Sequence, residues 1–554
     1  MLRKITAILL FPVLALVTAC AQIPSESPVI SGPDLDPQNV TEPIYYSPSG
    51  PYDGQTQQQV MTGFITAGTG PQNDYLTARD FLSKDFRATW SPNDEVLVLT
   101  GGIQVDISAE NIAIVTVKVQ ARVDEAGILY NFPEPIVRQL NYQLVQESGQ
   151  WRIATGPNLT ILNKAVFDVL FSGYSLYFFD ISRQYLVPEL RWFPARASTA
   201  TRLTNALITG ASTWLQPAVL RPLPKDVGLA IQAVTIQGGT AIISLNDKAN
   251  ALSDEDLRYF KTQAQVTLRQ LPAVSDVSIH LDSIPRLLSN VGYSESDSTG
   301  TTPVVLTNSR LEFLTGNPVQ GSQALIKQNQ ANDFALNTQT REVVMLSVTG
   351  LQWAKLGQID RSLVLLDSRF ALLSPSFDRS GKIWSISQQP SGEVRMVSKN
   401  FSQKVRADWL SGFSIEAYSV SREGSRMAVV VKRGQESKIF VSAIVRGTDG
   451  IPTELGSPIE FQPVSGSPVN VAWSSENQIT VAYRIVSRDQ ISVYQATLGG
   501  TTNSFGSVSS VKQIFSDSAG KAIYVLTKNL ELWENRGYGF NLVGAGISAA
   551  HLPK

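Results

Sequence analysis

The sequence is short of the residues that build most metal and redox sites. Its 554 residues include one cysteine, Cys20, and two histidines, His280 and His551. A single cysteine excludes an intrachain disulfide, and so few soft ligands exclude cysteine-based zinc sites and multi-histidine metal sites. We therefore expect no cofactor.

An excess of one charge is also missing. The 46 basic and 47 acidic residues leave a formal net charge of −1. Without a basic excess the chain lacks the electrostatic footprint that phosphate-backbone binding requires, so we expect no nucleic-acid partner. The remaining composition, 43% hydrophobic and 17% charged, is that of folded protein and excludes a disordered or fibrous chain.

Signatures of catalysis are scarce as well. The sequence contains no P-loop, HExxH, GxSxG or EF-hand pattern. His280 and Asp282 share the polar face of an expected strand, which favours a solvated surface pair over a catalytic base with its carboxylate. His551 lies close to the C-terminus, where chain ends usually fray. The pair Asp254 and Asp256 is explained by the positive end of an expected helix. The sequence therefore predicts a protein that is not an enzyme.

The N-terminus predicts export and lipid attachment. Two basic residues precede an apolar run over residues 5–17, which is too short to span a bilayer and is interrupted by Pro12. We therefore expect a signal peptide over residues 1–19. The residues before the lone cysteine, Leu16-Val17-Thr18-Ala19, resemble a bacterial lipobox. That resemblance implies lipidation of Cys20 by diacylglycerol and an N-acyl chain such as palmitate, which together anchor a protein firmly. The alternative is a chance cysteine beside an ordinary cleavage site.

The length requires several domains behind this anchor, because one core rarely serves more than about 300 residues. Residues 20–51 are rich in Pro, Ser, Asp and Gly and predict a flexible tether. Residues 52–165 contain two helical stripes followed by β-branched segments at 95–99, 112–123, 136–146 and 151–154. This order is similar to the nuclear-transport-factor-like α+β cones. We expect the interior of this cone-like domain to be filled by apolar side chains rather than by a ligand.

Residues 174–283 predict a second α+β domain. Two apolar segments flank the turn region Asp180-Ile181-Ser182-Arg183-Gln184, and helices are expected after Ser198 or Thr199 and after Ser253. Strands are expected at 229–236 and 241–245, joined by Gly238-Gly239, with a last strand at 277–281. The order resembles the GerMN domain of spore-germination proteins, which implies an extracytoplasmic interaction module without catalytic residues. The matching landmarks are Leu176-Tyr177-Phe178, Leu186-Val187-Pro188, Gly238-Gly239-Thr240-Ala241 and Leu271-Pro272-Ala273-Val274.

The third region, residues 292–554, repeats. Polar turns at 377–381, 420–424, 473–477 and 515–520 each lead into an apolar strand, and an earlier turn lies near 334. A weaker copy begins at Asp297-Ser298-Thr299-Gly300. A period in the low forties made of short strands predicts a β-propeller of about six blades.

A lipobox, a cone-like domain, a GerMN-like domain and a β-propeller in this order resemble the actinobacterial lipoprotein LpqB family. The stretch most similar to the family is Leu176-Tyr177-Phe178-Phe179-Asp180 with Tyr185-Leu186-Val187-Pro188-Glu189-Leu190-Arg191-Trp192-Phe193-Pro194. Residues 181–184 depart from the expected Pro/Gly-type turn. The resemblance implies a lipid-anchored protein on the extracytoplasmic face of the cell membrane. It also implies that the partner is the extracytoplasmic domain of a sensor histidine kinase, in the MtrA–MtrB two-component system of cell-envelope homeostasis and division.

Two classes of function follow. The first is a tethered, non-enzymatic adaptor that modulates a sensor kinase. The second is an envelope factor that binds cell-wall polymer or assists the assembly of other envelope proteins. A carboxylate pair brought together across the propeller mouth is the remaining enzymatic alternative. The aromatic residues near the junction of the first two domains favour a core with a fixed interdomain contact over an exposed interface patch. These aromatics are Phe167, Phe171, Tyr174, Tyr177, Phe178, Phe179, Tyr185, Trp192 and Phe193.

Overall fold

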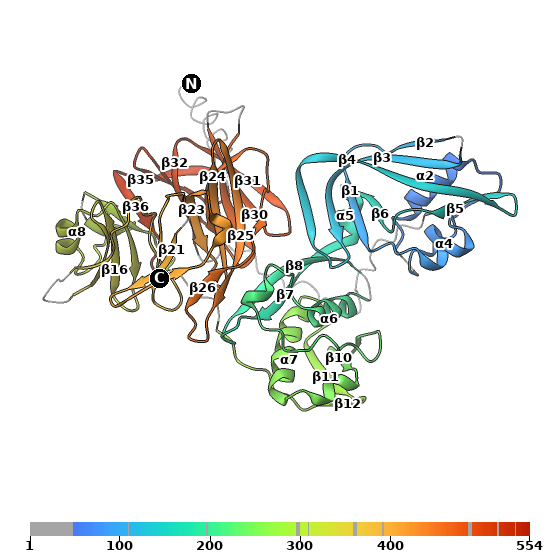
Figure 1. Cartoon of the computed structure of the whole chain (residues 1–554), viewed down its shortest axis with the longest axis horizontal. Helices are drawn as coiled ribbons and strands as arrows, with labels where there is room; N and C mark the ends of the chain where they lie inside the picture. The colour runs from blue at the N-terminus through green and yellow to red at the C-terminus, as the bar shows by residue number, and fades with distance from the viewer. Residues whose placement is uncertain are drawn as a thin grey trace, which may run out of the picture. The chain divides into compact units, whose positions relative to one another are not determined.

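The computed structural model describes residues 48–554 except 72, 109, 196–197, 295–299, 309, 358–362, 391–392, 486–489, 518–519 and 538. The signal peptide, Cys20 and most of the expected tether therefore lie outside the described residues, as does part of the turn beginning at Asp297. The described chain contains two α+β regions and a β-propeller (Figure 1), which confirms the predicted fold class.

The N-terminal region is a sheet with helices on it. Its strand order is β5-β4-β3-β1-β6, with β2 added to β3. All its neighbouring strands are antiparallel except β1 and β6, a parallel pair that the sequence analysis did not anticipate. The strands are β1 (Glu95–Leu99), β2 (Gln104–Ile107), β3 (Ile112–Asp124), β4 (Leu129–Glu147), β5 (Gln150–Thr155) and β6 (Thr160–Asn163). The helices are α2 (Gln57–Ala67), α3 (Leu76–Arg79), α4 (Lys84–Thr89) and α5 (Lys164–Leu170).

Local sequence explains where α2 begins. The Thr56 hydroxyl accepts a hydrogen bond from the Gln59 backbone N–H, and the Gln59 side chain accepts one from the Thr56 N–H, which is a capping box. Val60, Met61 and Phe64 then face the sheet and are buried. The interior of this region holds a continuous set of buried apolar side chains from helices and strands. That packing agrees with a filled cone.

The second region pairs a long hairpin with a four-stranded sheet. The hairpin is β7 (Phe171–Phe179) and β8 (Leu186–Pro194), antiparallel throughout, and β8 continues through Pro188 to Pro194. The sheet order is β12-β11-β10-β9, from β9 (Thr235–Gln237), β10 (Thr240–Leu245), β11 (Asp276–Leu281) and β12 (Ile284–Pro285). Helices α6 (Thr199–Thr209) and α7 (Asp254–Leu268) and 3₁₀ turns η1 (Gln216–Ala218) and η2 (Asp247–Ala251) complete the region.

Three predictions about this region are tested by the structure. The strand expected over residues 229–236 is wrong, because regular pairing covers only β9, and Leu229 forms an isolated bridge with Leu245. The turn at Gly238-Gly239 is confirmed: both glycines have positive φ, 55° and 80°, which a side chain disfavours. Ser253 caps α7 by accepting a hydrogen bond from the Asp256 N–H, as expected.

The third region consists of six antiparallel sheets, and this confirms the expected propeller. The first sheet joins β13 (Val304–Thr307) and β14 (Arg310–Phe313) to the last strand, β36 (Ile547–His551). The second holds β15 (Asp333–Asn337), β16 (Glu342–Ser347), β17 (Gly350–Lys355) and β18 (Val364–Asp367), preceded by helix α8 (Gln323–Asn329). The third holds β19 (Ser376–Phe377), β20 (Ile383–Ile386), β21 (Val394–Ser398) and β22 (Phe401–Val405), followed by the 3₁₀ turn η3 (Asp408–Leu410).

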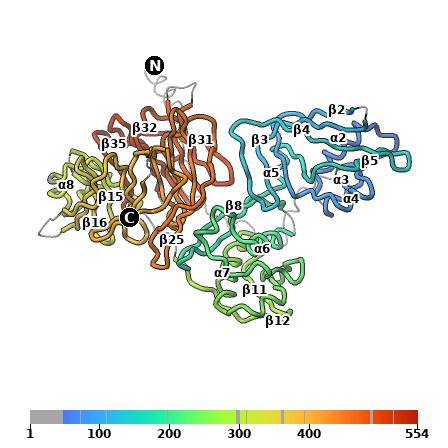
Figure 2. Tube along the Cα trace, viewed as in Figure 1, coloured from blue at the N-terminus to red at the C-terminus, as the bar shows by residue number. Residues whose placement is uncertain are grey.

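The remaining three sheets continue the repeat. The fourth holds β23 (Ser414–Val420), β24 (Arg426–Arg433), β25 (Glu436–Arg446), β26 (Pro452–Leu455) and β27 (Ile459–Glu460). The fifth holds β28 (Ser467–Trp473), β29 (Gln478–Arg484), β30 (Ile491–Thr497) and β31 (Thr502–Val508). The sixth holds β32 (Val511–Ser516), β33 (Ile523–Thr527), β34 (Glu531–Asn535) and β35 (Phe540–Ala545). Figure 2 shows the C-terminus of the chain within the propeller, where β36 closes the first sheet.

Candidate functional site

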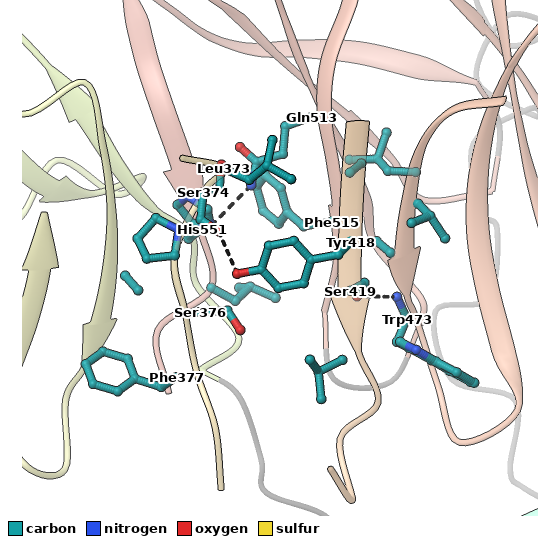
Figure 3. Close-up of a pocket in the computed structure, with 18 of the residues that line it drawn as sticks. Leu373, Ser374, Ser376, Phe377, Tyr418, Ser419, Trp473, Gln513, Phe515 and His551 are labelled. Atoms are coloured by element: carbon teal, nitrogen blue, oxygen red, sulfur yellow. Dashed lines mark hydrogen bonds between the residues drawn. The ribbon is translucent and has the colours of Figure 1, made fainter. Parts of the chain in front are cut away.

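The propeller encloses a cavity of about 390 Å³, which we call the channel cavity. One strand from each of the six sheets lines it: β15, β19, β23, β28, β32 and β36. Figure 3 shows side chains from several of these strands converging on the space. Its volume is within the range of small-molecule sites, so the channel cavity is the candidate functional site.

A polar cluster lies at the cavity wall: Ser374, Tyr418, Gln513 and His551 line the cavity, and Asp333 lies behind them, bonded to His551. His551 Nε2 is 2.6 Å from Asp333 Oδ1, and His551 Nδ1 is 3.2 Å from Gln513 Nε2. The Ser374 hydroxyl donates to the other oxygen of Asp333, and the Tyr418 hydroxyl donates to the Ser374 carbonyl oxygen at 2.7 Å. The cluster therefore links residues of four different sheets with Ser374, which precedes β19, and Figure 3 shows Ser374, Tyr418, Gln513 and His551.

Burial and hydrogen bonding set the ionisation of this cluster. Burial by itself raises the pKa of Asp333, but the charge that His551 can carry and the hydrogen bonds from His551, Ser374 and the Phe334 N–H lower that pKa overall. Burial raises the pKa of Tyr418, so its phenol stays protonated at neutral pH. The cluster thus combines a stabilised carboxylate with a protonated phenol.

This arrangement is not that of a Ser-His-Asp triad. The only serine hydroxyl in the cluster, that of Ser374, bonds to the carboxylate and not to the imidazole, so no imidazole is placed to take its proton. The expectation that His551 frays at the chain end is wrong. His551 ends strand β36, pairs with Val304 and packs edge-on against Phe334 with ring centroids 5.0 Å apart.

The other residues considered in the sequence lie elsewhere. His280 is half-buried on β11 and hydrogen-bonds to Ser278, while Asp282 follows the strand and accepts from Asn250, so the two do not form a pair. Asp254 is in the first turn of α7 and bonds to Arg286 at 2.8 Å. Among the residues that the structure describes, no group of three or more His, Cys, Asp or Glu side chains could hold a metal ion.

A second feature of the site, which the sequence did not reveal, is how the β7–β8 hairpin contacts the propeller. The Asp180 carboxylate accepts hydrogen bonds from the backbone N–H groups of Ser182, Gln184 and Tyr185, and so it closes the turn without glycine or proline. The same carboxylate pairs with Arg379 Nη2 of the propeller at 2.6 Å, and the two side chains are 1% and 8% exposed. The unusual turn sequence is therefore also an interdomain contact.

Further contacts fix the hairpin against the propeller. Arg426 is buried, pairs with Glu423 at 2.8 Å and donates to the Pro188 carbonyl oxygen at 3.1 Å. The Tyr177 hydroxyl donates to Glu476 at 3.0 Å, and Trp192 Nε1 donates to the Gly499 carbonyl oxygen at 2.8 Å. The junction aromatics thus serve a core and a fixed contact, the alternative that the sequence favoured.

Each of the three regions of this fold matches a known family model. Residues 50–168 match the family model described as lipoprotein LpqB, N-terminal domain, and residues 309–544 match the lipoprotein LpqB beta-propeller domain. Residues 175–286 match the Germane model, described as sporulation and spore germination. Together the matches define a multidomain protein that carries a germination-type domain between an α+β domain and a β-propeller. The chain belongs to the lipoprotein LpqB family.

The relatives are distant but collinear. The chain is 25% identical over 456 residues to lipoprotein LpqB of Bifidobacterium longum, covering 78% of this chain and 77% of that protein. It is 22% identical over 578 residues to lipoprotein LpqB of Cutibacterium acnes, covering 96% of both. TolB from Acinetobacter baumannii is similar at 13% identity over 58% of this chain and 88% of that structure, with a TM-score of 0.33, which is too low to bear on the fold. In the described part of the chain, no helix has the length and apolar character needed to cross a bilayer.

Proposed function

We propose that the chain is a membrane-anchored, non-enzymatic adaptor on the extracytoplasmic face that modulates a sensor histidine kinase of the MtrA–MtrB type. In this role it contributes to cell-envelope homeostasis and division. The observation that carries the proposal is an apolar edge on the germination-type domain, which we call the β12 edge. It consists of strand β12 with Arg286 and Leu287, and its exposed apolar side chains are those of Ile284 and Leu287.

The β12 edge has the features of a docking surface. Strand β12 is the last strand of its sheet, so within the described part of the chain no further strand pairs with its outer edge. Ile284 on this strand is 65% exposed, and Leu287 is fully exposed. Neighbouring apolar side chains left in water at a sheet edge are favourable places for a partner protein to bury surface.

The rest of the molecule supports a partner in the same membrane. The relatives in this family are named lipoproteins, in keeping with the lipobox-like residues before Cys20. Two proteins confined to one surface meet at a high effective concentration, so a modest affinity is enough for regulation. The Arg379–Asp180 pair attaches the germination-type domain to the propeller, so binding at the β12 edge acts on a body larger than one domain.

The test uses the full lipidated chain and the full-length kinase reconstituted in the same vesicles. We expect the chain to change phosphotransfer, and to bind the purified extracytoplasmic domain of the kinase in surface plasmon resonance. Regulation requires that the chain's affinity differ between the kinase states by about 1–3 kcal/mol, because equal affinity shifts nothing. The double variant Ile284→Asp, Leu287→Asp should bind at least about tenfold more weakly.

A matched control separates docking from misfolding. Val348 lies in the turn between β16 and β17 and is 93% exposed, so Val348→Asp places an aspartate at an exposed apolar position of the propeller and should leave binding unchanged. Unaltered circular dichroism of all variants establishes the fold. Absence of binding at tens of micromolar, together with unchanged phosphotransfer, contradicts the adaptor proposal. Recovery of cell-wall material in place of a kinase from membranes supports the envelope-factor alternative.

A further inference from the structure

Two equivalent arginines of the propeller have different partners. The repeated turns Phe377-Asp378-Arg379-Ser380-Gly381 and Val420-Ser421-Arg422-Glu423-Gly424 place Arg379 after β19 and Arg422 after β23. Arg379 pairs with the buried carboxylate of Asp180. Within the described residues, Arg422 has no carboxylate oxygen within 4.0 Å, although it lines the channel cavity.

The Arg422 side chain lines the channel cavity and extends to two neighbouring sheets. Its Nη2 donates to the carbonyl oxygen of Ser474 at 3.0 Å and to that of Asp517 at 2.6 Å. These two residues follow β28 and β32, so the side chain extends from the fourth sheet to the fifth and sixth. Its remaining N–H groups form no hydrogen bond with the residues that the structure describes, which leaves donors available at the cavity.

The acidic residues near Arg422 are engaged elsewhere. Glu423 pairs with Arg426, Glu476 accepts from the Tyr177 hydroxyl, and Asp517 accepts from the Lys521 N–H. Burial lowers the pKa of Arg422, and these three carboxylates act in the opposite direction without forming a direct pair. A half-buried guanidinium in this position gains from a bound anion, because the ion pair replaces part of the hydration that burial removes.

The walls of the cavity suit an organic molecule. Phe377, Val420 and Phe515 contribute apolar surface, and the Ser376 and Tyr418 side chains add hydroxyl groups (Figure 3). A volume of about 390 Å³ accommodates a compound with a ring or short chain and one acidic group.

We propose that the channel cavity binds a small organic anion whose carboxylate or phosphate group contacts Arg422 and whose apolar part packs between Phe377 and Phe515. The guanidinium supplies the charge recognition, because it stays protonated and forms charge-assisted hydrogen bonds with both kinds of oxyanion. The volume of the cavity matches a small molecule.

The test is isothermal titration of the full chain in detergent with phenylacetate, phenyl phosphate and the neutral 2-phenylethanol. We expect one of the two anions to bind with a dissociation constant below about 1 mM, and the neutral compound to bind at least about tenfold more weakly. The better of the two anions identifies the acidic group. If neither anion binds at about 10 mM, or if 2-phenylethanol binds as well as both, the proposal is wrong.

Variants connect the binding to the site. Arg422→Gln should weaken anion binding at least about tenfold, whereas Arg422→Lys, which keeps the charge, should retain part of it. Arg484 is an exposed arginine on β29, outside the cavity, and Arg484→Gln is the matched control. Ser376→Leu fills cavity space without altering a charge and should weaken all probes, which keeps the proposal testable if Arg422→Gln does not fold. Equal anion affinity of wild type, Arg422→Gln and Ser376→Leu would overturn it.

Discussion

At the scale of single residues, three buried ion pairs involve the propeller, and one of them joins it to the β7–β8 hairpin. Arg379 pairs with Asp180, Arg426 with Glu423, and Arg446 with Asp378, and all six side chains are at most 8% exposed. Burying a charge costs several kcal/mol unless a partner and hydrogen bonds compensate. Removing one partner therefore lowers the free energy of unfolding by more than the intact pair contributes to it, because the other charge stays buried.

The first prediction concerns Asp180→Asn. The amide keeps the size of the side chain but leaves Arg379 buried without its counter-charge, so we expect a loss of about 3–5 kcal/mol in the unfolding of the germination-type domain. Urea unfolding followed by tryptophan fluorescence measures it. Asp247 is a suitable control, because its side chain is 75% exposed and pairs only with Lys248 at the surface. If Asp180→Asn and Asp247→Asn have the same free energy of unfolding, the interdomain pair does not stabilise the fold.

The second prediction concerns acid stability. Hydrogen bonds and His551 lower the pKa of Asp333 in the folded chain, in spite of its burial. The ionised carboxylate therefore stabilises the fold above its unfolded pKa of about 3.9, and this stabilisation is lost as the pH falls through the lower folded pKa.

In Asp333→Asn the loss of thermal stability between about pH 6 and pH 2 should be smaller than in wild type, and stability near pH 6 should already be reduced. Differential scanning calorimetry across that range measures both. Asp408→Asn changes an exposed carboxylate of the same propeller and serves as the control. Identical pH profiles of wild type and Asp333→Asn would contradict the role given to the polar cluster.

At the scale of the element, strand β36 matters most for the stability of the propeller, because it closes the ring of sheets. It pairs with β13, at the other end of the propeller sequence, and its Ile547, Ala549 and Ala550 side chains are almost fully buried. A propeller without this strand exposes both the edge of β13 and the apolar surfaces on either side of the gap.

The third prediction is that a chain ending at Gly546 loses cooperative unfolding of the propeller. Losing the strand removes its hydrogen bonds, its apolar burial and the His551–Asp333 pair. Together these interactions contribute at least about 3 kcal/mol to the free energy of unfolding. A chain ending at His551 keeps β36 and should retain a cooperative transition. Circular dichroism during urea unfolding distinguishes the two truncations, and a transition of equal sharpness in both would contradict the closing role of β36.

At the scale of the whole molecule, the described residues form several buried apolar cores, one mainly in each α+β region and several between the sheets of the propeller. The germination-type domain contacts the propeller through polar pairs at the hairpin, such as Arg426 to Pro188, and through apolar packing, since Ala443 of β25 joins the core of that domain.

Each repeat of the propeller buries its apolar face against its neighbours, so residues 292–554 should still fold alone with β-rich circular dichroism and a cooperative transition. A helix-dominated spectrum from that segment would refute this.

The fourth prediction concerns attachment. Cys20→Ala removes the only thiol of the chain, and with it the acyl chains, each buried CH₂ of which contributes about 0.8 kcal/mol to membrane binding. We expect the variant to move from the membrane fraction to the soluble fraction after ultracentrifugation. Ser25→Ala nearby is the control and should stay with the membranes. A Cys20→Ala protein that sediments fully with membranes would place the anchor elsewhere.

The sequence by itself determined the class of each region, because local patterns carry that information. The alternation of residues 112–123, the Ser253 cap and the Gly238-Gly239 turn each specify an element through neighbours a few positions away. The propeller repeat was visible for the same reason, since each turn and strand recurs at a nearly constant spacing.

Only the tertiary structure decided which charged residues have partners. Arg379 and Arg422 occupy the same position in neighbouring repeats and both line the cavity, yet only Arg379 pairs with a carboxylate among the described residues, that of Asp180, 199 positions away. Likewise, His551 looked like a frayed end until β36 brought it to Asp333, 218 positions away. Contacts over such separations depend on how sheets close and domains dock, and no local pattern of residues encodes that geometry.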